Sequence, residues 1–386
     1  MMSLMICSRT VTGFLARQTQ HSSCRPKRCL HYYNSQWIQR RPSQKSIIAT
    51  RAAEQEEEEE DSGSTTETED PFSEYRNKNN INDQVVSGIS GQGGIKVTVC
   101  TIRNMINDLM IQHTMTEVPI QAMGRTLTCS LLIANGMQKE QTVQITLNSN
   151  GPLRGLVAIA SGGGKCRGFV GSPMLGDMSI FEAVGKGVLQ VVKNHPEWPR
   201  PYNGITAIQH GDIDRDVGIY LAESEQRSCA LAAATAVKGI LCVAAGGYLI
   251  EQLPGVTDEE VAQIEKNLAK LVEMDGGDQL PTNLLLSGTT PVDIMEIILD
   301  GLDAQPLQQL TPNLECDCTE DRLLRAIRLL PASEVDDLLE KEEQLEARCE
   351  FCGKVYRMES WEVKEKLEQA DGDPSLDSEF EDKGKK

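Results

Sequence analysis

The sequence predicts an α+β fold with an N-terminal core of antiparallel sheet and helices, a helical connector and a small C-terminal domain. Three observations predict it. Short segments of alternating apolar and polar residues succeed one another through residues 85–255, interrupted by stretches of helical periodicity. A long amphipathic pattern begins at Asp258, and two close cysteine pairs stand near the C-terminus.

The first 51 residues contain nine Lys and Arg, many Ser, and no Asp or Glu. This composition is typical of an organellar transit peptide, although a disordered basic arm would share the charge. The acidic run that follows at once favours the transit peptide. The Ser content favours import into the chloroplast, with the mitochondrion as the alternative.

Residues 52–84 are predicted to be an acidic disordered spacer. Residues 52–80 hold eleven acidic and two basic residues, with little apolar surface to bury. Residues 371–386 are predicted to form a disordered acidic tail on the same grounds.

Residues 85–255 are predicted to form the α+β core. Strand patterns cover residues 95–100, 142–147, 156–160, 166–170, 187–193, 204–209, 229–236 and 239–250. Helical patterns cover residues 101–113, residues 124–135 and the segment that begins at Asp212. We interpret Asp212, Asp214 and Asp216 as helix-capping residues. The Gly-rich segment 162–165 lacks the P-loop spacing, so we expect a hairpin turn there.

Residues 256–312 are predicted to be the helical connector. Residues 258–274 place acids in the first turn and apolar residues on one face, and a shorter helix begins at Pro291. No Ser-His-Asp arrangement is visible in the chain, so we expect no enzymatic activity.

The overall charge and hydropathy exclude two classes of partner. The chain carries a net charge of −19, which disfavours binding to nucleic acid. No apolar run approaches the roughly 20 residues that span a bilayer, so we expect no membrane segment.

Four of the twelve cysteines carry the chemistry. Cys316 and Cys318 form a C-x-C pair, and Cys349 and Cys352 form a C-x-x-C pair thirty residues further on. In a reducing compartment, this spacing predicts a tetrahedral Cys₄ site for one Zn²⁺ per chain within a domain of residues 313–370. Two structural disulfides, or unrelated thiols, are the alternatives. Five other cysteines are isolated and are predicted to be small core residues: Cys100, Cys129, Cys166, Cys229 and Cys242.

The acidic surroundings suggest that the cysteine site is a redox switch. Four thiolates give a Zn²⁺ cluster of charge −2, and residues 313–386 add 22 acids against 12 bases. Such a cluster should be oxidisable, and disulfide formation would eject the ion and unfold the domain. Helices predicted at residues 321–330 and 332–345 would then expose apolar side chains: Leu323, Leu324, Ile327, Leu329, Val335, Leu338 and Leu339. Tyr356 and Trp361 are expected to pack the small core of this domain.

Several segments together resemble one known family. They are LECDC at residues 314–318, EVDDLL at 334–339, CEFCGKVY at 349–356, DIDRD at 212–216 and AAGGYLIEQLP at 244–254. Over roughly residues 85–367, the chain resembles the thirty-three-kilodalton redox-regulated heat-shock chaperones.

The resemblance implies an ATP-independent holdase that is inactive when reduced and zinc-bound. It implies that oxidation forms the disulfides Cys316–Cys318 and Cys349–Cys352, releases zinc and unfolds the C-terminal switch and the connector. The surface exposed in this way would bind unfolding client proteins, and the oxidised chain would be a homodimer.

Two other functions remain open from the residues. A thiol-disulfide oxidoreductase could use Cys349 and Cys352, although such enzymes usually place C-x-x-C at the start of a helix in a βαβ unit. A structural zinc ribbon that mediates interactions would hold its metal under mild oxidants.

Overall fold

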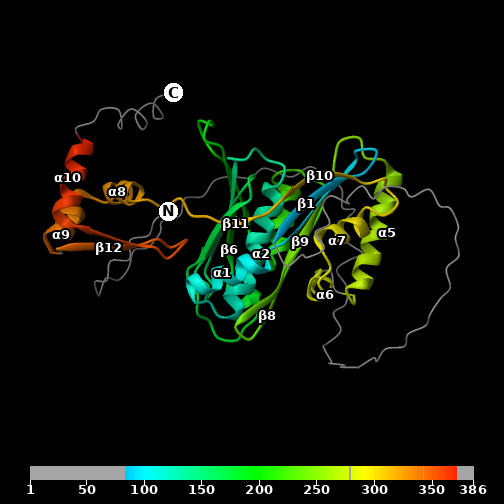
Figure 1. Ribbon diagram of the computed structural model, residues 1–386, viewed down its shortest axis with the longest axis horizontal. Coiled ribbons are helices and arrows are strands. Elements are labelled where there is room, and N and C mark those ends of the chain that lie inside the picture. The colour runs from blue at the N-terminus through cyan, green and yellow to red at the C-terminus, as the bar shows by residue number, and fades with distance from the viewer. Residues whose placement is uncertain (1–82, 278–279, 342, 372–386) are drawn as a thin grey trace, which may run out of the picture. The chain divides into compact units, whose positions relative to one another are not determined.

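The structure is a computed structural model that describes residues 83–277, 280–341 and 343–371 (Figure 1). The expected transit peptide, most of the expected acidic spacer and the expected tail from residue 372 lie outside the described residues. Two residues assigned to the spacer belong to the fold instead. Gln84 begins the first strand, and the Asp83 carboxylate accepts hydrogen bonds from the backbone N–H groups of Asn104 and Met105 at 2.9 and 2.6 Å. Asp83 belongs to the fold because its carboxylate satisfies two backbone N–H groups in the first turn of the helix that begins at Arg103.

The described strands form three sheets. A five-stranded antiparallel sheet has the order β10 (Gln305–Leu310), β1 (Gln84–Ile89), β2 (Ile95–Thr101), β9 (Leu241–Gln252) and β8 (Cys229–Lys238). A six-stranded sheet has the order β11 (Asn313–Leu314), β5 (Lys165–Val170), β4 (Leu156–Ser161), β3 (Thr142–Ser149), β6 (Gly187–Asn194) and β7 (Tyr202–Ala207). A hairpin joins β12 (Gln344–Arg348) to β13 (Val355–Glu359).

The described helices fall into three groups along the chain. Those of the core are α1 (Arg103–His113), α2 (Glu117–Ala134), α3 (Ile180–Val184) and α4 (Ile213–Glu223). Those of the connector are α5 (Asp258–Met274), α6 (Thr282–Leu286) and α7 (Pro291–Ile298). Those of the cysteine region are α8 (Glu320–Arg328), α9 (Ala332–Lys341) and α10 (Ser360–Asp371). In this part of the chain, no helix combines the length and the apolar character needed to cross a bilayer.

Helix α2 lies between the two large sheets and contacts strands of both. Its small residues allow this close approach. A Cβ on Gly124 would lie 2.4 Å from the Thr235 Oγ1 of β8, so only glycine fits at this crossing. The core around α2 includes Leu127 and Leu131, both almost fully buried. The two sheets therefore share one hydrophobic core through this helix.

The connector helices α5, α6 and α7 cover the opposite face of the five-stranded sheet. Strand β2 shows how the two faces are separated, since Cys100 packs into the core around α2 while Val97 and Val99 pack with the connector helices. The connector is not entirely helical as expected, because β10 at its end pairs with β1. Residues 305–310 form a strand because their backbone pairs with the edge of β1.

Most predicted elements are present, but two of the predicted helices have different bounds. Helix α2 begins at Glu117 rather than near Gly124, with Pro119 in its first turn. The helix expected over residues 332–345 ends at Lys341, and the chain turns into β12. Leu345 and Ala347 alternate onto the buried face of the β12–β13 hairpin, so tertiary pairing overrides the helical pattern.

The acidic residues at the start of α4 are not the helix caps that we expected. Asp212 occupies the N-cap position but makes no side-chain cap hydrogen bond. Asp212 and Asp214 instead pair with the Arg125 guanidinium of α2 at 2.5 and 3.2 Å. The Asp216 carboxylate accepts backbone hydrogen bonds from residues 209–211. Their role is to join α4 to α2 and to the preceding turn.

Candidate metal centre

Two separate segments supply the four cysteines of the expected metal site. Cys316 and Cys318 lie between β11 and α8, and Cys349 and Cys352 lie in the turn that joins β12 to β13. In that turn, the Gly353 N–H donates to the Cys349 carbonyl at 2.8 Å, and Gly353 has a φ of +72°. Because a left-handed conformation favours glycine, Gly353 lets the chain reverse beside the second pair.

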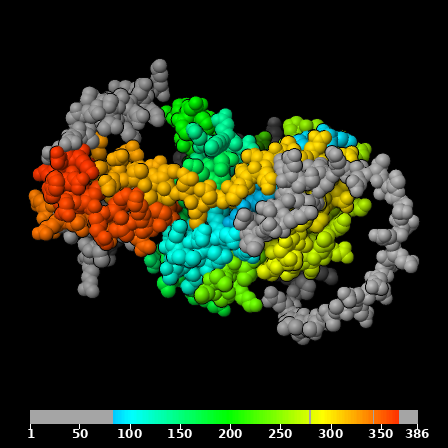
Figure 2. Space-filling model, viewed as in Figure 1, coloured from blue at the N-terminus to red at the C-terminus, as the bar shows by residue number. Residues whose placement is uncertain are grey.

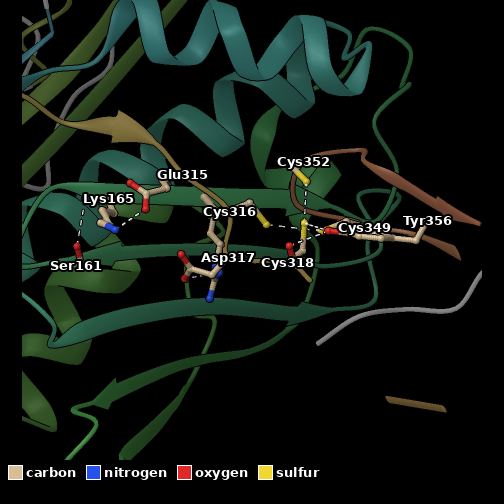
Figure 3. Close-up of polar contacts among 10 residues, drawn as sticks. Ser161, Lys165, Glu315, Cys316, Asp317, Cys318, Cys349, Cys352 and Tyr356 are labelled. Atoms are coloured by element: carbon tan, nitrogen blue, oxygen red, sulfur yellow. Dashed lines mark hydrogen bonds and ion pairs between the residues drawn. The ribbon is translucent and has the colours of Figure 1, made fainter. Parts of the chain in front are cut away.

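The four thiols converge on one point (Figure 3). Their sulfur atoms all lie within 4.8 Å of one another, and all nine cysteines in the described part of the chain are free thiols. The Cys316 and Cys349 sulfurs are 3.7 Å apart, and the Cys318 and Cys352 sulfurs are 3.4 Å apart. The four cysteines therefore share one site, which argues against the alternative of unrelated thiols.

The donor set fits a zinc ion. Four sulfurs at about 2.3 Å from a tetrahedral Zn²⁺ lie about 3.8 Å from one another, close to the observed separations. Four thiolates are the ligand set of closed structural zinc sites, and soft sulfur donors disfavour Mg²⁺ and Ca²⁺. The residues present can therefore hold a zinc ion.

Tyr356 supports the first cysteine pair from β13. Its hydroxyl lies 2.7 Å from the Cys318 carbonyl oxygen and 3.1 Å from the Cys318 sulfur, and it can donate its proton to either (Figure 3). The Lys354 ammonium lies 4.7 Å from the centre of the Tyr356 ring. Tyr356 therefore both orients a ligand and belongs to the packed interior of this region.

Three of the thiols differ in their electrostatic surroundings. Burial raises the pKa of Cys316 to about 11, and burial also raises the pKa of Cys352. Burial acts in the same direction on Cys318, but hydrogen bonds from the Tyr356 hydroxyl and the neighbouring thiols outweigh it and lower the pKa of that thiol. Among Cys316, Cys318 and Cys352, Cys318 is thus the sulfur whose negative charge is best supported by its surroundings.

A small hydrophobic cluster lies beside the cysteines, and Cys318 packs against it. It is made of Leu323, Ile327, Leu345, Ala347, Tyr356, Met358 and Val363, with α9 contributing only partly buried residues. Tyr356 is buried as expected, but the expectation for Trp361 is wrong because its side chain is 67% exposed. Leu329 was expected to become exposed only on unfolding, but this expectation is wrong because its side chain is already 83% exposed. A core of this size gives little stability without an additional clamp.

Comparisons with known proteins identify the family of this chain. The family described as Hsp33 protein matches residues 83–359, which include all four cysteines. The chain belongs to the Hsp33 family. A 33 kDa chaperonin of Synechocystis is 33% identical over 288 residues, covering 71% of this chain and 92% of that protein. The 33 kDa chaperonin of Clostridioides difficile is 29% identical over 296 residues, covering 74% and 99%.

The fold of this Hsp33-family chain is also found in a solved structure. The crystal structure of the 33 kDa chaperonin of Thermotoga maritima matches it with a TM-score of 0.65 and 22% sequence identity. The match covers 76% of this chain and 100% of the other. The expected α+β fold with its antiparallel sheets and C-terminal cysteine cluster is thereby confirmed, and the relatives' names indicate a chaperone.

The cysteine region contacts β5 of the core through residues that sequence reasoning missed. Lys165 pairs with Glu315, and the Arg167 guanidinium lies 3.3 Å from the Asp317 carboxylate. Phe169 meets Phe351 edge to face, with ring centres 5.1 Å apart. The only sequence signal was the alternation of Arg167 and Phe169 along the strand predicted over residues 166–170, which places them on one face, whereas Lys165 was assigned to the preceding turn.

Helix α1 provides one further contact. His113 Nε2 lies 2.9 Å from the Phe351 carbonyl oxygen, and burial lowers the pKa of His113. The ring is therefore neutral near pH 7 with its proton on Nε2, since a carbonyl can only accept. Nothing in the sequence marks His113 for this role.

Proposed function

We propose that this chain is a redox-regulated, ATP-independent holdase chaperone, inactive while Cys316, Cys318, Cys349 and Cys352 hold one Zn²⁺. The observation that carries the proposal is the convergence of four free thiols from two distant segments. Membership of the Hsp33 family supports it, because relatives are named 33 kDa chaperonins.

In the reduced state, the ligand thiolates tie the segment before α8 to the β12–β13 turn. A bound Zn²⁺ supplies the charge that holds four thiolates together, and structural sites of this kind contribute about 10–16 kcal/mol to folding. The chain's own residues do the remaining work. Leu323 and Ile327 pack α8 against the hairpin, and the Tyr356 hydroxyl orients the Cys318 peptide. The region stays folded while these ligands remain reduced.

Oxidation removes the ligands. Two thiolates lose two electrons as one S–S bond forms, while one hypochlorous acid takes up these electrons and a proton to give chloride and water. Two equivalents of hypochlorous acid convert four thiolates into two disulfides, and Zn²⁺ is released. Peroxide serves as the alternative oxidant when the domain is already partly unfolded.

We propose the disulfides Cys316–Cys318 and Cys349–Cys352, the pairing implied by the family resemblance. In the reduced structure, the short sulfur separations instead join Cys316 to Cys349 and Cys318 to Cys352. Mass spectrometry of tryptic peptides from the oxidised chain distinguishes the two pairings.

Loss of the ligands unfolds the switch and the connector beside it. The apolar faces of α8 and of the connector helices then become available to unfolding client proteins, which bind without ATP. We propose that the oxidised chain is a homodimer. We further propose no enzymatic activity and no nucleic-acid partner, in keeping with the net charge of −19.

The proposed organisation keeps the expected boundaries, apart from Asp83 and Gln84. It consists of a transit peptide (1–51), an acidic spacer, a core to residue 255, a connector (256–312), a zinc switch (313–370) and an acidic tail. We propose the chloroplast as the destination, with the mitochondrion as the alternative. Import of the first 51 residues fused to a fluorescent protein separates the two.

The geometry disfavours the oxidoreductase. Cys349 and Cys352 lie in a turn between antiparallel strands, not at the N-terminus of a helix that would activate a thiolate. Catalytic reduction of insulin disulfides by the reduced chain would support that function against the holdase.

The test follows zinc release with a chromogenic chelator during exposure to hypochlorite, and scores aggregation of a heat-denatured client on the same samples without ATP. The holdase predicts that one zinc per chain leaves as suppression appears, and that a thiol reductant with zinc reverses both. Zinc that stays bound, or leaves without any gain in suppression, contradicts it and favours a structural zinc ribbon.

A further inference from the structure

Only the two-residue strand β11 separates β5 from the edge of the six-stranded sheet. Strand β11 pairs with it in parallel, Asn313 opposite Lys165 and Leu314 opposite Cys166, whereas every other pairing in this sheet is antiparallel and longer. The Asn313 N–H donates to the Gly164 carbonyl at 3.0 Å, and the Glu315 N–H donates to the Cys166 carbonyl at 2.9 Å. Without β11, the backbone of β5 would be an open edge.

The segment that covers this edge also carries two of the metal ligands. Cys316 follows β11 after one intervening residue, so the cysteine cluster fixes one end of the covering segment. Strand β10 fixes the other end by pairing with β1. Residues 311–314 lie against α1, and Figure 2 shows this yellow-to-orange stretch at the molecular surface beside the cyan residues of α1.

Two outward side chains of β5 pair with the covering segment, and a third packs against the β12–β13 turn. The outward residues Lys165 and Arg167 pair with Glu315 and Asp317, and the next outward residue, Phe169, packs against Phe351. The Arg167 guanidinium also lies 5.2 Å from the centre of the Phe351 ring. An extended chain with acids at alternate positions therefore complements Lys165 and Arg167, and an aromatic ring from the β12–β13 turn covers Phe169.

The same face continues as an apolar surface on the next strand. Val157 lies opposite Phe169 and Ile159 lies opposite Arg167 in the register of β4 and β5, and both are only partly buried. Removal of Phe351 would leave Phe169 and Val157 exposed beside an unpaired strand edge. This combination suits a strand that brings both acidic and apolar side chains.

We propose that the edge of β5 is a strand-docking site for client polypeptides, occupied by residues 313–317 of the chain itself until the metal leaves. The site would take an extended client segment that adds to the sheet beside β5, with acidic side chains at Lys165 and Arg167 and an apolar side chain at Phe169. The inference rests on the proposed function, since it supplies the surface that oxidation uncovers.

The first experiment uses a labelled peptide with the sequence of residues 311–319 in which both cysteines are replaced, Cys316→Ser and Cys318→Ser. Fluorescence anisotropy measures its binding to the full chain, zinc-loaded and oxidised. We expect binding to the oxidised chain that is at least about tenfold tighter than to the zinc-loaded chain, because the chain's own segment competes in the latter. Equal binding to both forms would overturn the proposal.

A charge exchange tests the matching of side chains. The double substitution Lys165→Glu and Arg167→Glu should weaken binding of this peptide by about tenfold, and a peptide carrying Glu315→Lys and Asp317→Lys should recover it. Lys186→Glu with Lys238→Glu, both exposed and away from β5, is the matched control and should leave binding unchanged. Failure of the reversed peptide to recover binding would overturn the proposal.

Client aggregation is scored on the same samples, and the peptide is added as a competitor. An oxidised chain that suppresses aggregation but does not bind the peptide leaves the holdase standing and rejects the docking site. An oxidised chain that never suppresses aggregation rejects the holdase itself. A third outcome is that the oxidised chain loses peptide binding as it self-associates, while the peptide does not compete with the client. That outcome would assign the β5 edge to a second copy of the chain and overturn the inference.

Discussion

The core and the cysteine region of this chain are stabilised by different means. The core stacks two sheets around α2 and covers one sheet with α5–α7, so two extensive hydrophobic clusters share β1, β2, β8 and β9. The cysteine region has one small cluster, helix α9 has no buried residue, and four thiols meet beside it. The comparison indicates that burial alone suffices for the first region, whereas the second depends on its ligands.

The largest expected effect comes from removing a ligand. Cys316→Ser or Cys349→Ser should cost the cysteine region much of the roughly 10–16 kcal/mol that a structural zinc site contributes, and should make the holdase partly independent of oxidant. Chelator titration and limited proteolysis measure the outcome. Cys229→Ser, at a half-buried thiol of β8, is the matched control and should retain one zinc. A fully metallated and silent ligand mutant would contradict the account.

A cavity in the core should destabilise the core without affecting the zinc site. Leu127 of α2 is fully buried between the sheets, so Leu127→Ala should lower the free energy of unfolding of the core by about 2–5 kcal/mol. Urea denaturation measures this loss, and the zinc content should stay at one per chain. Ile240→Ala, at a side chain that is 87% exposed, should change neither quantity. Zinc loss in the Leu127 variant would show that the two regions are not independent.

A cavity in the small cluster should appear as weaker metal binding. Ile327 is 1% exposed, and Ile327→Ala should lower zinc affinity about thirtyfold, because about 2 kcal/mol of folding energy is coupled to binding. Competition with a chelator of known affinity measures the change. Leu329→Ala lies two residues away on the exposed side and should have almost no effect. Equal effects of the two substitutions would argue against a packed cluster beside the site.

The smallest expected effect is the loss of one hydroxyl. Tyr356→Phe removes the hydrogen bond to Cys318 while keeping the buried ring, so zinc affinity should fall by about tenfold and oxidant should release zinc faster. Stopped-flow mixing with hypochlorite and a chromogenic chelator measures the rate. Trp361→Phe, at an exposed ring of the same region, should leave the rate unchanged. An unaltered rate in Tyr356→Phe would remove Tyr356 from the site.

Elements with a strong local signal could be predicted from sequence. The helix expected over residues 258–274 has those bounds, because Thr257 and Glu260 form a capping box and its apolar residues keep a helical period. The cysteine spacing also predicted the cluster, since two close pairs can reach one point only if the chain between them folds back.

Elements defined by distant partners could not be predicted. The polar sequence QPLQQL becomes β10 only because β1 offers an open edge, and two residues become β11 only because β5 does. The same holds for Phe351, whose neighbours Phe169 and Arg167 lie more than 180 positions earlier in the chain. Local propensity carries no information about such contacts.

The dependence of the cysteine region on its ligands is the central claim. Hydrogen exchange with mass spectrometry, on the zinc-loaded chain and after removal of zinc by hypochlorite, tests it in one experiment. The account predicts that amides of α8, β12 and β13 lose protection by orders of magnitude while those of α2 keep it. Protection retained across residues 320–359 without zinc, or lost equally in α2, would contradict the account.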